Sequence, residues 1–159
     1  FIEPTQNIRS LGVKLKLNST KTIVKNKSII LIDDSLVRGT TCLKIVKMLF
    51  EDGAKEVHVR IACPEIKHPD FYGVDMPTKK ELLAYNKNID EMCEYINATS
   101  LKFLSLDGLY KALLNEKRNP NYPQFSDHYF TGDYPIEPLD RIKGIKIKQL
   151  SLLSGKSNS

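Results

Sequence analysis

Blocks of apolar residues predict strands that alternate with helices along the chain. The continuous apolar run of residues 29–32, within an expected strand over 28–33, is typical of a strand that is buried on both faces of a sheet. Residues 40–51 place apolar side chains at helical spacing, and Gly53 then provides a stop. The side chains of this helix that we expect to face the core are Leu43, Ile45, Val46, Leu49 and Phe50. Residues 56–63 alternate apolar and polar positions and predict a second strand. A strand–helix–strand unit of this kind predicts two parallel strands in an α/β fold.

The rest of the chain predicts shorter elements that are separated by loops. Thr78 with Glu81, and Asn88 with Glu91, have the spacing of capping boxes at helix starts. We expect a loop over 64–77, a short helix after Thr78, a helix over 88–97, a strand over 101–104 and a helix over 105–115. Two prolines exclude regular helix from residues 119–127, which we interpret as a linker.

Composition narrows the class of protein. The 159 residues predict one domain, and 41% hydrophobic with 27% charged residues is typical of a soluble globular protein. No apolar run is long enough to span a membrane, and no cleavable signal peptide is visible. Three widely spaced cysteines indicate free thiols in a reducing cytosol, so we expect a cytoplasmic protein.

The net charge of +5 raises the question of nucleic-acid binding. The lysines lack interleaved aromatic residues and no nucleic-acid-binding motif is present, so we interpret them as solvated surface charges. Their field could attract a polyanionic substrate. The two basic clusters are Lys14, Lys16, Lys21, Lys25 and Lys27, and then Lys143, Lys146, Lys148 and Lys156. His58, His68 and His128 are scattered, and we expect structural or solvent-facing roles for them.

Residues 29–41 carry the candidate chemistry. Asp33 and Asp34 follow the first strand, where open α/β sheets bind ligands. Their carboxylates point to opposite sides of an extended backbone, which suits several hydroxyls or a hydrated Mg²⁺ better than a shared proton. Gly39 permits a left-handed or crowded backbone, and the following helix directs free amides at the loop. The further polar side chains are Ser35, Arg38, Thr40 and Thr41. An acid pair beside a phosphate cradle fits a ribose 5-phosphate.

The order of these residues resembles the phosphoribosylpyrophosphate (PRPP) motif of type I phosphoribosyltransferases. Further segments narrow the resemblance to the glutamine PRPP amidotransferases, over roughly residues 1–135. These segments are Phe1–Pro4, Val13–Asn18, Asp33–Thr41, Gly53–Val57, Pro64–Ile66, Phe71–Pro77 and Phe130–Pro135. The resemblance implies a partial type I phosphoribosyltransferase fold, a parallel sheet flanked by helices. We expect the chain to comprise a C-terminal portion of the transferase domain (1–118), a C-terminal extension (119–150) and, from its polar composition, a disordered tail (151–159).

The resemblance also implies an activity and a set of ligands. The family forms 5-phosphoribosylamine from PRPP and glutamine-derived ammonia, releasing pyrophosphate, in purine biosynthesis. Asp33 and Asp34 would bind the ribose hydroxyls and Mg²⁺. The residues that would hold the 5-phosphate are Ser35, Leu36, Val37, Arg38, Gly39, Thr40 and Thr41. PRPP and purine nucleotides are the implied ligands, and a homo-oligomer is implied for the full-length form.

Two departures from the family pattern matter. The glutaminase domain and the upstream pyrophosphate loop have no counterpart here, so we assign no catalytic residue and expect a C-terminal fragment whose N-terminal half a second chain could supply. Some members carry an iron–sulfur cluster on cysteines. Asp70 and the segment 124–129 stand at the matching positions without any cysteine, so we expect no cluster.

Two other interpretations stay open at this stage. Another type I phosphoribosyltransferase could use a nucleobase as acceptor, although Phe71–Pro77 argues against it. A non-enzymatic chain, either an inactive remnant or a regulatory module that binds PRPP or nucleotides, would explain the missing half. A base-dependent release of pyrophosphate would favour the first, and an in-frame glutaminase domain in the DNA immediately upstream would settle most of the question.

Overall fold

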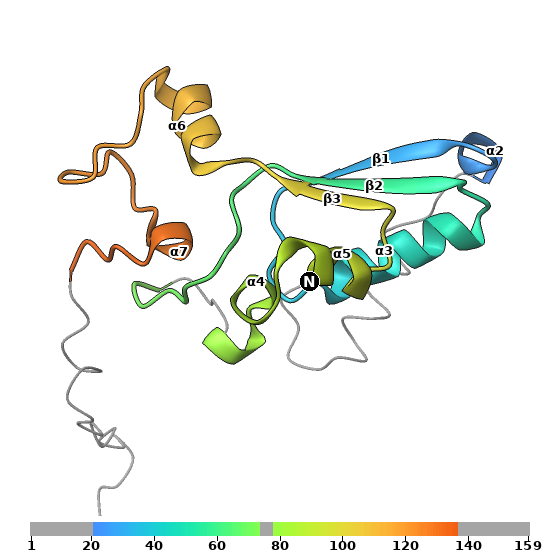
Figure 1. The fold of residues 1–159 in the computed structure, drawn as a ribbon, viewed down its shortest axis with the longest axis horizontal. Coiled ribbons are helices and arrows are strands. Elements are labelled where there is room, and N and C mark those ends of the chain that lie inside the picture. Colours follow the sequence, from blue (N-terminus) through green and yellow to red (C-terminus); the bar gives the residue numbers. More distant parts are fainter. Residues whose placement is uncertain (1–20, 74–77, 137–159) are drawn as a thin grey trace, which may run out of the picture.

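The computed structural model describes residues 21–73 and 78–136. Three parallel strands form one sheet in the order β1-β2-β3, with β1 at Ser28–Asp33, β2 at Glu56–Ile61 and β3 at Ser100–Phe103 (Figure 1). Asp33 is paired with Ile61, and Ile61 with Phe103, so the carboxyl ends of all three strands meet at one edge. The parallel strand pairing predicted from the sequence is confirmed.

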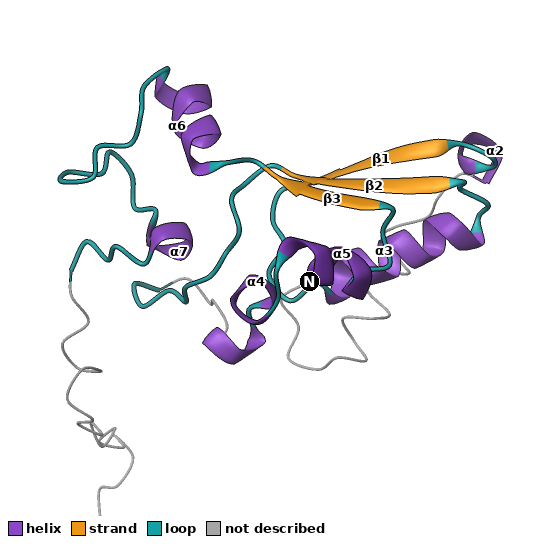
Figure 2. Cartoon of the chain, viewed as in Figure 1, coloured by secondary structure: helices purple, strands orange, loops and turns teal. Residues whose placement is uncertain are grey.

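Helices join and follow these strands. They are α2 (Lys21–Val24), α3 (Thr40–Glu51), the 3-10 helix η1 (Lys79–Glu81), α4 (Leu83–Asn86), α5 (Ile89–Tyr95), α6 (Leu106–Leu114) and α7 (His128–Thr131). Figure 2 shows α3, α4 and α5 below the sheet, all on the same side. In the part of the chain that the structure describes, no helix is both long and apolar enough to cross a membrane.

The core lies between this helical layer and one face of the sheet. Val57, Val59 and Leu101 point into it from β2 and β3 and are almost fully buried. On β1 the burial alternates, and Ile30 and Ile32 keep 66% and 73% of their surface exposed. The prediction that this strand is buried on both faces is therefore wrong within residues 21–73 and 78–136, because the packed helices lie on one side only.

Several element ends depart from the sequence expectations by one or two residues, including those of β2, β3 and α5. β2 ends at Ile61, two residues earlier than expected, before the turn that leads to Pro64. The capping box at Asn88 is confirmed, since the side chains and amides of Asn88 and Glu91 bond reciprocally. The capping box at Thr78 is wrong, because the Glu81 amide donates to the Thr78 backbone carbonyl instead of its hydroxyl. A single 3-10 turn follows.

The C-terminal part of the described chain forms an arm beyond β3. Helix α6 is close to the expected range, capped by the Ser105 hydroxyl and ended by Asn115 in the left-handed region. Residues 119–127 contain no helix or strand, and the short helix α7 after them was not expected. The predicted segment 1–20 and the tail 151–159 lie outside the described residues.

Candidate functional site: the loop between β1 and α3

The acid pair lies where β1 leaves the sheet. Asp33 is the last residue of β1 and is half-buried, whereas Asp34 is exposed. The Asp34 amide donates to Asp33 Oδ1 at 3.0 Å, and the Ser35 hydroxyl donates to Asp34 Oδ1 at 2.9 Å. These bonds hold the two carboxylates at the carboxyl edge of the sheet, the position expected from the sequence.

Electrostatics at Asp33 favour a ligand with positive charge or hydrogen-bond donors. Burial raises the pKa of Asp33, the Asp34 amide partly offsets this, and the neighbouring Asp34 charge raises it again. The Asp34 amide is thus the one group found to stabilise the ionised Asp33 carboxylate among the described residues. Two adjacent carboxylates with open surroundings fit Mg²⁺, which takes one or two carboxylates plus waters and phosphates. No cluster of three or more potential metal ligands occurs in residues 21–73 and 78–136, so any cation here would need ligand oxygens as well.

Gly39 precedes α3 in a left-handed backbone conformation, and the helix start that follows has the backbone amides that a phosphate site requires. Its φ of +75° is left-handed, and a Cβ there would lie 2.7 Å from Leu83 Cδ2 and 3.0 Å from Tyr95 Cε1. No side chain caps the helix, and the first intrahelical bond runs from the Leu43 amide to the Gly39 carbonyl. The amides of the first turn, beside Thr40 and Thr41, are therefore directed at the loop with the positive end of the helix dipole.

The remaining loop residues have different surroundings. Leu36 is 2% exposed and belongs to the core, so only its backbone can contribute to a ligand site. The Val37 carbonyl accepts from the Leu83 amide at 2.8 Å. Arg38 Nε donates to Glu81 Oε1 at 3.3 Å, with 39% of the Arg38 side chain exposed. The structure thus brings the acids, Arg38 and the helix start into one continuous loop.

Two cysteines lie beside the acid pair. Burial raises the pKa of Cys42 to about 12 and that of Cys63 to about 11, and the charges of Asp33 and, for Cys63, Asp34 add to this. Both thiols are therefore protonated at neutral pH and are poor nucleophiles. The three cysteines of the chain are free, as the sequence indicated.

Curated proteins of similar sequence carry the name amidophosphoribosyltransferase. The chain is 53% identical over 155 residues to an amidophosphoribosyltransferase of Rhizobium etli, a match that covers 97% of the chain. It is 50% identical over 140 residues to the amidophosphoribosyltransferase of Staphylococcus aureus, covering 88% of the chain. The chain corresponds to part of an amidophosphoribosyltransferase. No family model matches it.

Solved amidophosphoribosyltransferases share the fold as well. The glutamine PRPP amidotransferase of B. subtilis, solved with ADP and GMP, superposes with a TM-score of 0.70 at 44% identity over 85% of this chain. A second structure, of the allosteric regulatory enzyme of purine biosynthesis, gives a TM-score of 0.69 at 45% identity. The fold is therefore that of the type I phosphoribosyltransferases. The chain spans about 30% of the length of these relatives and matches their C-terminal portion.

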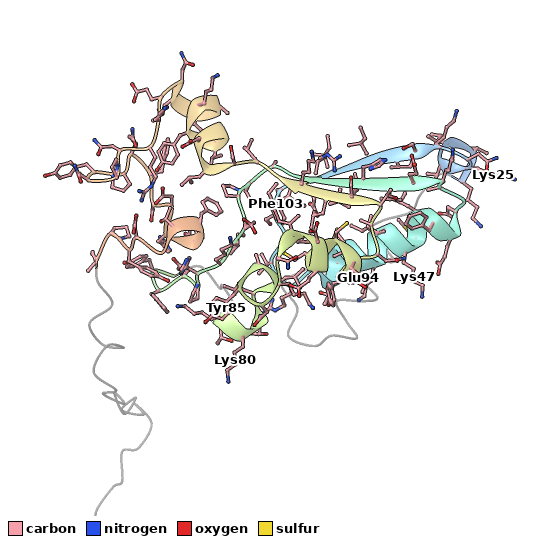
Figure 3. The ribbon with its side chains drawn as sticks, viewed as in Figure 1. Lys25, Lys47, Lys80, Tyr85, Glu94 and Phe103 are labelled. Carbon is pink, nitrogen blue, oxygen red and sulfur yellow. The ribbon has the colours of Figure 1, made fainter. Side chains whose placement is uncertain are left out.

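The contacts that support the loop between β1 and α3 from outside could not be predicted from the sequence. Glu81 and Leu83 lie more than 40 residues beyond Arg38, and the sequence indicates only a helix start for that segment. A hollow of about 680 Å³ lies elsewhere, at the open edge of β3 near Phe103 and Phe130, and its lining does not include residues 33–41 (Figure 3 labels Phe103). We place the candidate site in the loop, because the phosphate and hydroxyl chemistry is there.

Proposed function

We propose that this chain carries the PRPP-binding motif of an amidophosphoribosyltransferase that forms 5-phosphoribosylamine in de novo purine biosynthesis. The observation that carries the proposal is the acid pair at the end of β1, followed by a loop that enters α3 through a left-handed Gly39. The identity of 53% to a relative of that name supports it. The cytoplasm is the location that suits such a biosynthetic enzyme.

The roles of the loop residues follow from their geometry. Asp33 and Asp34 would accept hydrogen bonds from the ribose hydroxyls, while the first amides of α3, the Thr40 and Thr41 hydroxyls and Arg38 would bind the 5-phosphate. Mg²⁺, when bound through Asp33 and Asp34, would neutralise charge on the pyrophosphate leaving group. The residues present fit that role, because both carboxylates lie at the sheet edge and Asp33 lacks compensating charge.

The reaction itself exchanges one bond at the anomeric carbon. The lone pair of ammonia forms a C–N bond, the bond to pyrophosphate breaks, and the ammonium nitrogen loses a proton to solvent. Positive charge develops on the sugar during this exchange, and the nearby carboxylates would stabilise it. The described residues include no group that we assign to proton transfer, so the loop would act by binding and orientation.

Glutamine-dependent synthesis would need residues outside this sequence. A polypeptide limited to these 159 residues offers no assigned glutaminase nucleophile, and we expect no phosphoribosylamine from glutamine and almost none from free ammonia. An N-terminal half, in the same or a second chain, and a homo-oligomer are the partners that the proposal implies. Robust glutamine-dependent turnover by the purified chain would contradict this part of the proposal.

A nucleotide-binding role at the same loop is the second candidate. It is favoured by the solved B. subtilis relative, whose structure contains ADP and GMP. A purine mononucleotide presents the same ribose hydroxyls and 5-phosphate as PRPP but lacks the pyrophosphate. Mg²⁺ should therefore strengthen PRPP binding far more than GMP binding.

Calorimetry on the full chain tests the proposal. We expect Mg²⁺–PRPP to bind, and Asp33→Asn with Asp34→Asn to abolish measurable binding, since each lost charge-assisted bond costs roughly 1.5–3 kcal/mol. The matched control replaces two exposed carboxylates elsewhere, Glu94→Gln on α5 and Glu116→Gln, and should bind like the wild type (Figure 3 shows Glu94). Equal binding by the Asp33 and Asp34 double variant would refute the assigned roles.

A further inference from the structure

A short segment after the loop contacts three consecutive residues of the candidate site. We call residues 78–86 the clamp segment; it comprises Thr78, η1 and α4. Its contacts reach Val37 through a backbone hydrogen bond, Arg38 through an ion pair and Gly39 through side-chain packing. The phosphate loop is therefore held from one side by a segment that the PRPP motif itself does not contain.

Glu81 is the charged contact of the clamp segment. Its Oε1 accepts from Arg38 Nε at 3.3 Å, and its Oε2 accepts from the Thr78 hydroxyl at 3.4 Å. The carboxylate is thus held on both oxygens. This contact uses only Nε of Arg38. Within residues 21–73 and 78–136 the two terminal amino groups of Arg38 make no hydrogen bond, so they remain available to donate to an anion.

The backbone around this pair is fixed by independent contacts. The Leu83 amide donates to the Val37 carbonyl at 2.8 Å, and the Leu83 side chain lies against Gly39. Leu83 is 7% exposed, so the clamp segment is anchored in the core rather than resting on the surface. Arg38 and Glu81 consequently start from fixed backbone positions on both sides.

The ion pair is better suited to orientation than to stability. The Arg38 and Glu81 side chains are 39% and 50% exposed, and exposed pairs contribute little to the free energy of unfolding. An arginine side chain has many rotamers, however, and restricting them before a ligand arrives removes part of the entropy cost of binding. The pair can therefore matter for a ligand while leaving the fold almost unaffected.

We propose that Glu81 is a positioning residue, which holds Arg38 by its Nε so that the terminal amino groups face the 5-phosphate of the ligand. This inference rests on the proposed function, because it takes the phosphate to bind at residues 35–41. It adds a residue outside the PRPP motif to the determinants of affinity. Glu81 itself would touch no ligand atom.

A double-mutant cycle on the full chain tests the proposal, with Mg²⁺–PRPP as the probe and calorimetry as the readout. Glu81→Ala should weaken binding roughly threefold to tenfold, as expected for loss of a pre-ordered side chain. Arg38→Ala should weaken it roughly tenfold or more. The double variant should be no worse than Arg38→Ala alone, because Glu81 acts only through Arg38. Glu81→Gln retains an acceptor oxygen and should fall between Glu81→Ala and the wild type.

The matched control is Lys80→Gln, next to Glu81 in the same segment. Lys80 points away from the molecule, so its replacement should leave the affinity within about twofold. Thermal midpoints of all variants should stay close to the wild type. Side-chain ¹⁵N relaxation of Arg38 Nε in the wild type needs no variant and should report an ordered group.

The outcomes separate this inference from the proposed function. Absence of PRPP binding by the wild type overturns the proposed function and the inference with it. Wild-type binding that Glu81→Ala leaves unchanged or strengthens overturns only the inference. Losses that multiply in the double variant, or an Arg38 Nε that relaxes as a freely rotating group, also overturn it.

Discussion

At the scale of single residues, Gly39 is the most constrained position of the site. Any side chain there would have to adopt a φ of +75° and would meet Leu83 at 2.7 Å. We expect Gly39→Ala to lower the free energy of unfolding by about 2–4 kcal/mol and to abolish ligand binding. The control is Gly53→Ala, which has a φ of +92° but meets its nearest neighbour, Lys25 Cγ, only at 3.4 Å. Urea unfolding should show the smaller loss for Gly53→Ala; equal losses would mean that packing at Leu83 is unimportant.

Asp33 should show a trade-off between stability and binding. Its pKa is raised in the folded chain, so its ionisation opposes folding at pH values above that pKa, and this penalty disappears as the pH falls below the ordinary value of 3.8. Asp33→Asn should therefore raise the thermal midpoint at pH 7 and weaken PRPP binding. The gain in midpoint should vanish near pH 3.5 (roughly, from the ordinary pKa). A variant that is less stable than the wild type at pH 7 would contradict the sign of this shift.

The sequence could predict where the candidate site residues lie, because they are contiguous. Asp33, Asp34 and Gly39 each have the surroundings that the motif indicated. Glu81 could not be found in this way, because its partner Arg38 lies 43 residues earlier and only the folded chain brings them together. The same three-residue spacing gave a capping box at Asn88 but none at Thr78, where the Glu81 amide donates to the Thr78 backbone carbonyl instead. A local sequence pattern shows which hydrogen bonds are possible, but it does not show whether a helix-start amide donates to a side chain or to a backbone carbonyl.

At the scale of elements, a buried ion pair holds the C-terminal arm together. Asp127 is 3% exposed and accepts from Arg118 Nε at 2.6 Å and from the Tyr110 hydroxyl at 2.8 Å. Asp127→Ala should destabilise the arm by about 3–5 kcal/mol, because it leaves Arg118 without its buried partner. Asp133→Ala removes the exposed partner of the same Arg118 and should cost less than about 1 kcal/mol. Hydrogen exchange of the α6 and α7 amides measures both losses, and similar values for the two variants would refute the distinction.

The Asp127 pair also predicts how the arm responds to acid. Burial alone would raise the pKa of Asp127, but the hydrogen bonds from Arg118 and Tyr110 outweigh it and hold the pKa below the ordinary 3.8. The arm should keep this stabilisation at and above neutral pH and lose it as the pH falls from about 4 through the lowered pKa. Hydrogen exchange of the α7 amides against pH should show this loss, and Asp127→Asn should flatten the profile. A profile that is the same in both proteins would contradict the assignment.

The arm is also joined to the loop after β2 by a buried contact that the sequence did not reveal. His128 is fully buried, and its Nε2 lies 2.8 Å from Asp70 Oδ1 while its Nδ1 lies 3.0 Å from the Ser126 hydroxyl. Of the two roles expected for the histidines, structural or solvent-facing, His128 has the structural one. The pairing across 58 residues follows from tertiary packing, which hydrophobic periodicity does not encode.

At the scale of the whole molecule, one face of the sheet is uncovered in the described residues, and along β1 that face is apolar. Ile30 and Ile32 are exposed on β1, where burial alternates from residue to residue. β1 is an edge strand in this sheet, and α3, α4 and α5 all lie on one side of the sheet (Figure 1). Exposed apolar surface beside an unpaired strand edge promotes association. We expect light scattering to show oligomers of the 159-residue chain, and Ile30→Thr with Ile32→Thr to reduce them while keeping strand propensity. A cooperative, monomeric unfolding transition of the wild type would contradict this expectation.

The parallel pairing of the strands was predictable from the sequence. Whether helices cover one or both faces of the sheet was not. The strand–helix–strand pattern over residues 28–63 predicted the parallel pairing of β1 and β2. The apolar run of β1 could not show whether a second helical layer lies over it, because both faces of that strand read as hydrophobic in the sequence. Similar limits apply to α6, whose Leu113 remains 58% exposed although its spacing is that of a packed helix.

The central claim is that a ribose 5-phosphate group binds at the loop between β1 and α3. The most direct measurement is a titration of the ¹⁵N-labelled chain with Mg²⁺–PRPP, followed by amide chemical shifts. The account predicts that the largest shifts fall on the amides of residues 34–42, with smaller ones at Glu81 and Leu83 of the clamp segment. Saturable shifts confined instead to the hollow near Phe103 and Phe130, or the same loop shifts in the chain with both Asp33→Asn and Asp34→Asn, would contradict it.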